Sequence, residues 1–179
     1  MLNFKQLVIF LCIFSISLIF LGCKKSASKV AIPNLGFTMM LPTGWQVDSK
    51  DNTNFYESTK QDDNFGWVAE YELEEDESLT EFVDSLIVDI KNMELEQIEL
   101  QKSLGEEVEY PETQLLAKNS RTVNGREAIE LITEANYSIL EFYILKDNKI
   151  IQVTFRVLKD DFSKYEPLLR KSIETIKIK

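Results

Sequence analysis

Cys23 is the residue whose type and setting predict the most specific chemistry in this 179-residue chain. It follows Gly22 at the end of the apolar run 7–21, and Lys5 precedes that run. A charged start, a short apolar stretch and a small residue at the cut site define a secretory signal. We therefore predict a signal peptide over residues 1–22, cleavage before Cys23, and attachment of acyl chains to the Cys23 thiol.

Residues 20–23, Phe-Leu-Gly-Cys, resemble the lipobox of bacterial lipoproteins in the relaxed form found in spirochaetes and some other bacteria. Two alternatives stay open. An uncleaved membrane helix would need ~20 apolar residues, more than the run provides. An ordinary signal would be cut elsewhere, for example near Ser26-Ala27-Ser28. The lipobox resemblance implies a lipid anchor in a membrane of the bacterial cell envelope, with the domain facing the periplasm or the cell exterior.

Several kinds of chemistry are excluded by residues that the sequence lacks. There is no histidine, and the second cysteine, Cys12, lies inside the predicted leader. These absences remove Ser-His-Asp and Cys-His catalysis, and also zinc or copper sites that depend on histidine. No sequence motif for a cofactor is present, so we expect neither a cofactor nor an enzyme. The net charge of −10 disfavours binding to nucleic acid, because phosphates would be repelled.

Acidic side chains form the one pattern that suits a metal ion. Oxygen-rich loops are typical of calcium sites. The candidate ligands are Glu72, Glu74 and Asp76, in an acidic run over residues 70–77, and a second acidic loop covers residues 106–112. The alternative interpretation is a solvated acidic surface, which is what charge runs usually form.

The elements that would position these residues begin with a helix at Ser78. Ser78 and Glu81 have the spacing of a capping box. Apolar residues then recur at helical spacing, which predicts one buried stripe and a helix that ends near Gln101. A second helix is predicted over residues 160–176. The two predicted stripes are Leu79, Phe82, Val83, Leu86, Ile90 and Met93 in the first helix, and Leu168, Leu169 and Ile173, with Ile176 as a possible addition, in the second.

Strand patterns occupy most of the remaining chain. Alternation predicts strands over residues 32–41 and 66–73, with a shorter one at 54–59. Asn124-Gly125 and Asp147-Asn148 each separate two strand patterns, which predicts two hairpins. Residues 139–145 are apolar on both faces, which is typical of a central strand. We expect Trp45 and Trp67 to pack in the core.

This order of elements predicts an α+β domain, in which a mostly antiparallel sheet of about six strands lies between helices in an α/β/α sandwich. Four stretches also carry a family resemblance. They are Leu41-Pro42-Thr43-Gly44-Trp45 after Gly36-Phe37, Leu79-Thr80-Glu81-Phe82, Val123-Asn124-Gly125-Arg126-Glu127-Ala128, and Tyr165-Glu166-Pro167 with Ser172-Ile173. Together they resemble the PsbP-like superfamily, whose fold is an antiparallel sheet between helices.

The resemblance implies a small secreted lipoprotein and carries over no photosystem role. Some relatives bind zinc through histidine, a site that this chain lacks. We expect a signal peptide at 1–22, a lipidated tether at 23–32 and a PsbP-like domain at 33–179. The first functional hypothesis is a non-enzymatic binding or assembly module for a protein partner. The alternative is a lipoprotein that binds a cation or small ligand at its acidic surface or between sheet and helix.

Overall fold

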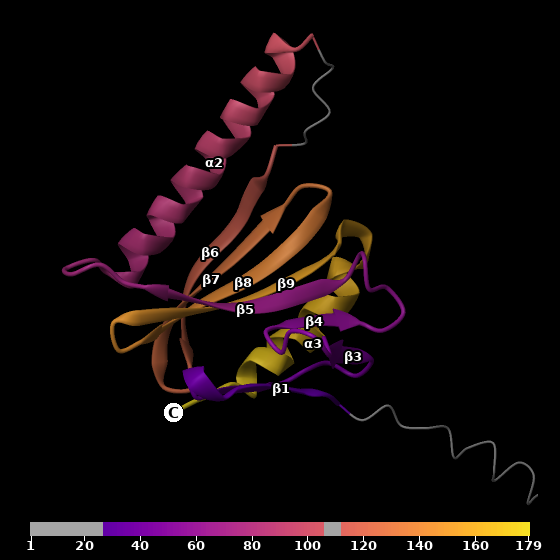
Figure 1. Ribbon diagram of the computed structural model, residues 1–179, viewed down its shortest axis with the longest axis vertical. Coiled ribbons are helices and arrows are strands. Elements are labelled where there is room, and N and C mark those ends of the chain that lie inside the picture. The colour runs from indigo at the N-terminus through magenta and orange to yellow at the C-terminus, as the bar shows by residue number, and fades with distance from the viewer. Residues whose placement is uncertain (1–26, 106–111) are drawn as a thin grey trace, which may run out of the picture.

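The computed structural model describes residues 27–105 and 112–179 of the chain (Figure 1). The predicted leader and Cys23 lie outside the described residues, as does most of the second acidic loop. In the part that is described, no helix has the length and apolar character needed to span a membrane.

A seven-stranded antiparallel sheet forms the centre of the domain. Its strands lie in the order β3-β4-β5-β9-β8-β7-β6. The α+β fold class is therefore confirmed, with one strand more than the six expected for the sheet. The strands are β3 (Trp45–Val47), β4 (Asn54–Glu57), β5 (Phe65–Glu72), β6 (Gln114–Val123), β7 (Arg126–Glu134), β8 (Tyr137–Lys146) and β9 (Lys149–Leu158).

Both predicted hairpins are present. Asn124 and Gly125 have φ values of 51° and 75° and join β6 to β7. Asp147, with a φ of 57°, begins the turn between β8 and β9. Left-handed backbone suits Asn, Asp and Gly, and it matches the twist of paired strands. The hairpins place β8 between β7 and β9, as predicted for a central strand.

A second, three-stranded sheet was not predicted. It joins β1 (Lys29–Ile32), β2 (Phe37–Met40) and β10 (Lys177–Ile178), and the 3-10 turn η1 (Pro33–Leu35) connects the first two strands. We expected the tether to continue through residue 32. Instead Val30 and Ile32 of β1 are buried in the core, so the folded domain begins before residue 33.

The two helices cover opposite faces of the main sheet. Helix α2 (Leu79–Ser103) begins with the predicted capping box of Ser78 and Glu81. Helix α3 (Phe162–Glu174) follows the short turn η2 (Lys159–Asp161) and shares its face of the sheet with β1, β2 and β10. Leu168 is 45% exposed, contrary to the predicted stripe, whereas Leu169 and Ile173 are buried. The buried apolar residues consequently form two clusters, one on each side of the sheet.

Candidate functional site

Helix α2 packs against the sheet only along its first half. Leu79 and Val83 are buried against β7, β8 and β9, and Phe82, Leu86 and Ile87 are partly buried. The outer half of α2 diverges from the sheet, and its end projects beyond the strands (Figure 1). The prediction that Met93 belongs to the buried stripe is wrong, because its side chain is 57% exposed.

The outer half of α2 exposes an apolar surface that we call the outer α2 surface. Met93, Leu100 and Leu104 are each more than half exposed and share one flank of the helix by their spacing, whereas the exposed Leu95 lies on the opposite flank. Acidic residues at 89, 96 and 99 are also exposed there. The outer α2 surface consists of Met93, Leu100 and Leu104.

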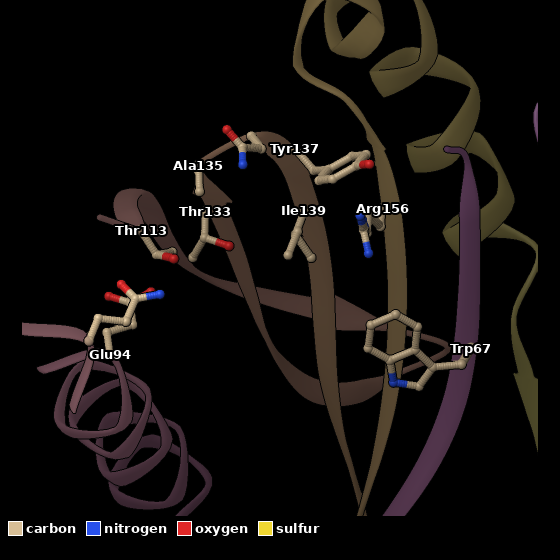
Figure 2. Close-up of a pocket in the computed structure, with 10 residues that line it drawn as sticks. Trp67, Glu94, Thr113, Thr133, Ala135, Tyr137, Ile139 and Arg156 are labelled. Carbon is tan, nitrogen blue, oxygen red and sulfur yellow. The ribbon is translucent and has the colours of Figure 1, made fainter. Parts of the chain in front are cut away.

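An open cavity of about 580 Å³ lies where α2 diverges from the sheet, and we call it the α2–sheet cavity. Glu94 and Gln101 line it from α2, and Thr113 lines it just before β6. Figure 2 shows residues of the sheet pointing into the same space. The residues from β5, β7, β8, β9 and the β7–β8 turn are Trp67, Thr133, Ala135, Asn136, Tyr137, Ile139 and Arg156.

Arg156 is the cation of this cavity. Its guanidinium carbon lies 3.4 Å from the ring centroid of Tyr137 and 4.8 Å from that of Phe65. Cation–π contacts of this kind hold a guanidinium in a fixed plane. Among the described residues no carboxylate pairs with Arg156, and its buried Nε has no hydrogen-bond partner. The buried Oε1 of Gln101 is likewise unpartnered.

The two tryptophans differ in their settings. Trp45 is 1% exposed and packs against Phe55 and Phe155, which agrees with the predicted core position. Trp67 is only partly buried and forms a wall of the α2–sheet cavity, contrary to the same prediction. Strand β5 places alternate residues on opposite faces, so Val68 enters the core that Trp67 faces away from.

A buried polar network lies next to the cavity on the same face of the sheet. Glu141 on β8 is only 8% exposed. It accepts hydrogen bonds from Nε2 of Gln152 at 2.7 Å and from the hydroxyl of Thr154 at 3.3 Å. Gln152 also donates to the Tyr143 hydroxyl and accepts from the Tyr71 hydroxyl. Burial raises the pKa of Glu141 above its ordinary value, because these bonds offset only part of the desolvation.

The other buried glutamate, Glu130 on β7, has the opposite surroundings. It lies on the α3 face, where Arg121, Arg170 and Asn119 donate to its carboxylate. Burial alone would raise its pKa, but the hydrogen bonds from these donors outweigh burial and hold the pKa below its ordinary value. This ion-paired group is therefore a structural element and not a free ligand site.

The acidic candidates are not brought together into a site. Glu72 is an ion pair with Lys149 at 2.8 Å, and Glu70 contacts the same lysine at 2.9 Å. Glu74 and Asp76 are exposed in the loop before α2. Within residues 27–105 and 112–179, no group of three or more acidic residues is arranged to hold a metal ion. Cation binding by Glu72, Glu74 and Asp76 stays a prediction that a calcium titration tests.

Sequence reasoning missed both Arg156 and Glu141 as site residues. A signal was present, because the Asp147-Asn148 turn fixes the register of β8 against β9. That register pairs Glu141 with Thr154 and Ile139 with Arg156. The polar residues of β9 therefore share one face with Glu141, and α2 covers part of that face.

Comparisons with known proteins concern the fold. No protein-family model matches the sequence, and no curated protein matches it. The solution structure of cyanobacterial PsbP (CyanoP) from Synechocystis sp. PCC 6803 aligns with a TM-score of 0.61 and 13% identity, over 87% of this chain and 94% of that one. The crystal structure of LpqN, involved in cell envelope biogenesis of Mycobacterium tuberculosis, aligns with a TM-score of 0.52 and 11% identity, over 79% and 82%. The chain thus has a PsbP-like fold, as the sequence motifs implied.

Proposed function

We propose that this PsbP-like chain is a membrane-anchored bacterial lipoprotein whose domain is a non-enzymatic binding module for a protein partner. The observation that carries the proposal is the outer α2 surface. Apolar side chains that gather on an exposed surface mark interaction sites more often than isolated ones do. The same helix buries its first half in the domain, which leaves its outer half as a projecting, rigid binding surface.

The chemistry of the outer α2 surface indicates the kind of partner. Met93 and Leu100 supply apolar contact area, and the exposed Asp89 and Glu96 lie beside them on the same flank. A protein surface with an apolar centre and a rim of lysine or arginine would be complementary. A bilayer surface is less suitable, because anionic head groups would be repelled by these carboxylates.

The location rests on the sequence and is supported by one comparison. Cys23 and the preceding apolar run have the features of a lipoprotein signal. LpqN, which shares the fold at 11% identity, is described as involved in cell envelope biogenesis. A cysteine that carries two or more acyl chains would remain stably in a membrane, whereas one chain binds marginally. Residues between Cys23 and β1 would then form the tether.

The absence of histidine from the sequence supports a binding role over catalysis. One specific observation favours the alternative function, binding of a small ligand. The α2–sheet cavity is large enough for an organic molecule and contains Arg156, which has no carboxylate partner among the residues that the structure describes. Because this cavity and the outer α2 surface use different side chains, the two functions can be tested separately.

Site-specific photocrosslinking tests the protein partner. A benzophenone amino acid would replace Met93 or Leu100 in the full-length protein, in the cells that produce it. Leu168, an exposed leucine on α3, provides the matched control. We expect one discrete crosslinked protein from positions 93 and 100 and none from position 168. Equal crosslinking from all three positions, or none from any, would contradict the proposal.

Intact-mass measurement tests the anchor independently. We expect the mature protein to begin at Cys23 and to carry the added mass of its acyl chains. The Cys23→Ser variant should lose the lipid and leave the membrane fraction. A mature protein without lipid at Cys23 would remove the anchor from the proposal and leave the binding surface to be judged by crosslinking.

A further inference from the structure

The α2–sheet cavity has features that the proposed protein partner does not explain. Its cation, Arg156, is held between the rings of Tyr137 and Phe65 and has no carboxylate partner among the described residues. The domain as a whole is strongly acidic. A guanidinium that stays unpaired in such a chain, beside an open cavity, is available to an anion from outside.

Two buried polar atoms strengthen this interpretation. Within the described part of the chain, Nε of Arg156 and Oε1 of Gln101 lack hydrogen-bond partners, and both residues line the cavity. A buried donor or acceptor without a partner costs roughly 1–3 kcal/mol. An anion that accepts from Nε of Arg156 would remove this cost at the guanidinium.

The walls define the body of the ligand. Figure 2 shows Trp67 and Arg156 pointing into the same space from neighbouring strands, with Ile139 beside them. The Trp67 indole and the Ile139 side chain provide a flat apolar boundary. Aromatic ligands stack on indole rings, and the volume of about 580 Å³ admits a molecule with fused rings.

Glu94 limits the charge of the ligand. Its carboxylate lies on α2, across the cavity from Arg156 (Figure 2). A second negative charge on the ligand would be repelled there, whereas one carboxylate beside Arg156 would not. We propose that the α2–sheet cavity binds a small aromatic monocarboxylate, with the carboxylate on the Arg156 guanidinium and the ring against Trp67.

The two tryptophans allow a direct test with the full-length protein. Binding of 2-naphthoate is measured by calorimetry and by the indole N–H resonances. We expect the Trp67 resonance to shift and the Trp45 resonance, from the opposite side of the sheet, to stay in place. Arg156→Gln should weaken binding at least tenfold, and Arg156→Lys should weaken it less, because a lysine keeps the charge but loses the planar fork. Arg126→Gln, which changes a cation outside the cavity, is the matched control.

Three further ligands separate charge from shape. The neutral 2-naphthamide should bind at least tenfold more weakly than 2-naphthoate. We expect 2,6-naphthalenedicarboxylate to bind weakly to the natural chain and better to Glu94→Gln. Failure of 2-naphthoate to bind at millimolar concentration would overturn the proposal, as would equal binding to Arg156→Gln or of the amide. If a peptide ending in phenylalanine bound more tightly than 2-naphthoate, the cavity would be a site for the carboxyl terminus of a polypeptide. That result would contradict the proposal of a small aromatic acid as the ligand.

Discussion

Glu130 and Glu141 lie on neighbouring strands of one sheet, one residue apart in register, and their side chains are buried on opposite faces. Glu130 pairs with Phe142, and Leu131 pairs with Glu141. Two arginines neutralise Glu130, whereas Glu141 has only neutral hydrogen-bond donors among the described residues. The two carboxyl groups therefore have pKa values shifted in opposite directions.

Glu141→Gln is predicted to stabilise the domain at neutral and higher pH. The raised pKa means that the folded state binds the proton of Glu141 more tightly than the unfolded state does. This tighter proton binding stabilises the folded state at low pH. The stabilisation is lost as the pH rises from 4.5, the ordinary pKa of a glutamate, through the pKa of Glu141 in the folded state. We expect a gain of roughly 1–3 kcal/mol at about pH 8 that shrinks toward about pH 5, measured by urea unfolding. Glu127→Gln, at an exposed position, is the control, and a gain that did not depend on pH would contradict the assignment.

Glu130→Gln is predicted to have the opposite effect. Because the pKa of Glu130 is lowered in the folded state, its ionised carboxylate stabilises the domain at pH values above 4.5. This stabilisation is lost as the pH falls through the pKa of Glu130 in the folded state. Removing the charge leaves Arg121 without its carboxylate partner and leaves Arg170 paired with Glu166 alone. We expect the free energy of unfolding to fall by about 2–4 kcal/mol at neutral pH. This is somewhat less than for breaking a fully buried ion pair, because both arginines are partly exposed. The loss should decrease in acid, and an unchanged urea midpoint would show that the pair is not stabilising.

Gly66→Ala is predicted to destabilise the sheet through a collision. A Cβ atom at residue 66 would meet the carbonyl oxygen of Thr154 and the ring of Phe55. The expected loss is about 3 kcal/mol or more. Gly44→Ala is the control, because Gly44 has a φ of +93° and open space around it, so only backbone strain of roughly 1–2 kcal/mol applies. Thermal unfolding that ranked Gly44→Ala as the more damaging change would contradict this packing.

Ser78→Ala is predicted to weaken the start of α2. The Ser78 hydroxyl accepts from the Glu81 backbone N–H, and the Glu81 carboxylate accepts from the Ser78 N–H at 2.9 Å. Loss of the cap should cost about 1 kcal/mol. Amide hydrogens in the first turn of α2 should exchange faster. Those in β8 should exchange faster only to the extent that the free energy of global unfolding has decreased. Uniform loss across both elements would mean that the first turn does not open on its own.

The sequence predicted the elements whose signals are local. The turns at Asn124-Gly125 and Asp147-Asn148 and the capping box at Ser78 act within a few residues, and all three are present. Strand β10, with two residues, carries too little pattern to be recognised. Strand β1 was assigned to the tether because its burial depends on β2, a partner that local pattern does not reveal.

The candidate site was less accessible to sequence reasoning than the fold. The stripe through Met93 continues at helical spacing, but burial stops where the sheet ends, which is a property of tertiary structure. Gln152, Thr154 and Arg156 alternate with apolar residues, and such alternation is equally typical of a solvated face. Only the position of α2 over β8 and β9 makes these residues part of a site.

The most direct test of the proposed function is the dissociation constant between the full-length protein and its purified crosslinked partner. We predict that Leu100→Glu weakens this binding at least tenfold, that Leu168→Glu leaves it unchanged, and that added salt weakens it through the acidic rim. Both variants change an exposed leucine on a helix, so general effects on folding and solubility are matched. Equal affinity of the Leu100→Glu variant and the natural chain would contradict the assignment of the outer α2 surface as the binding surface.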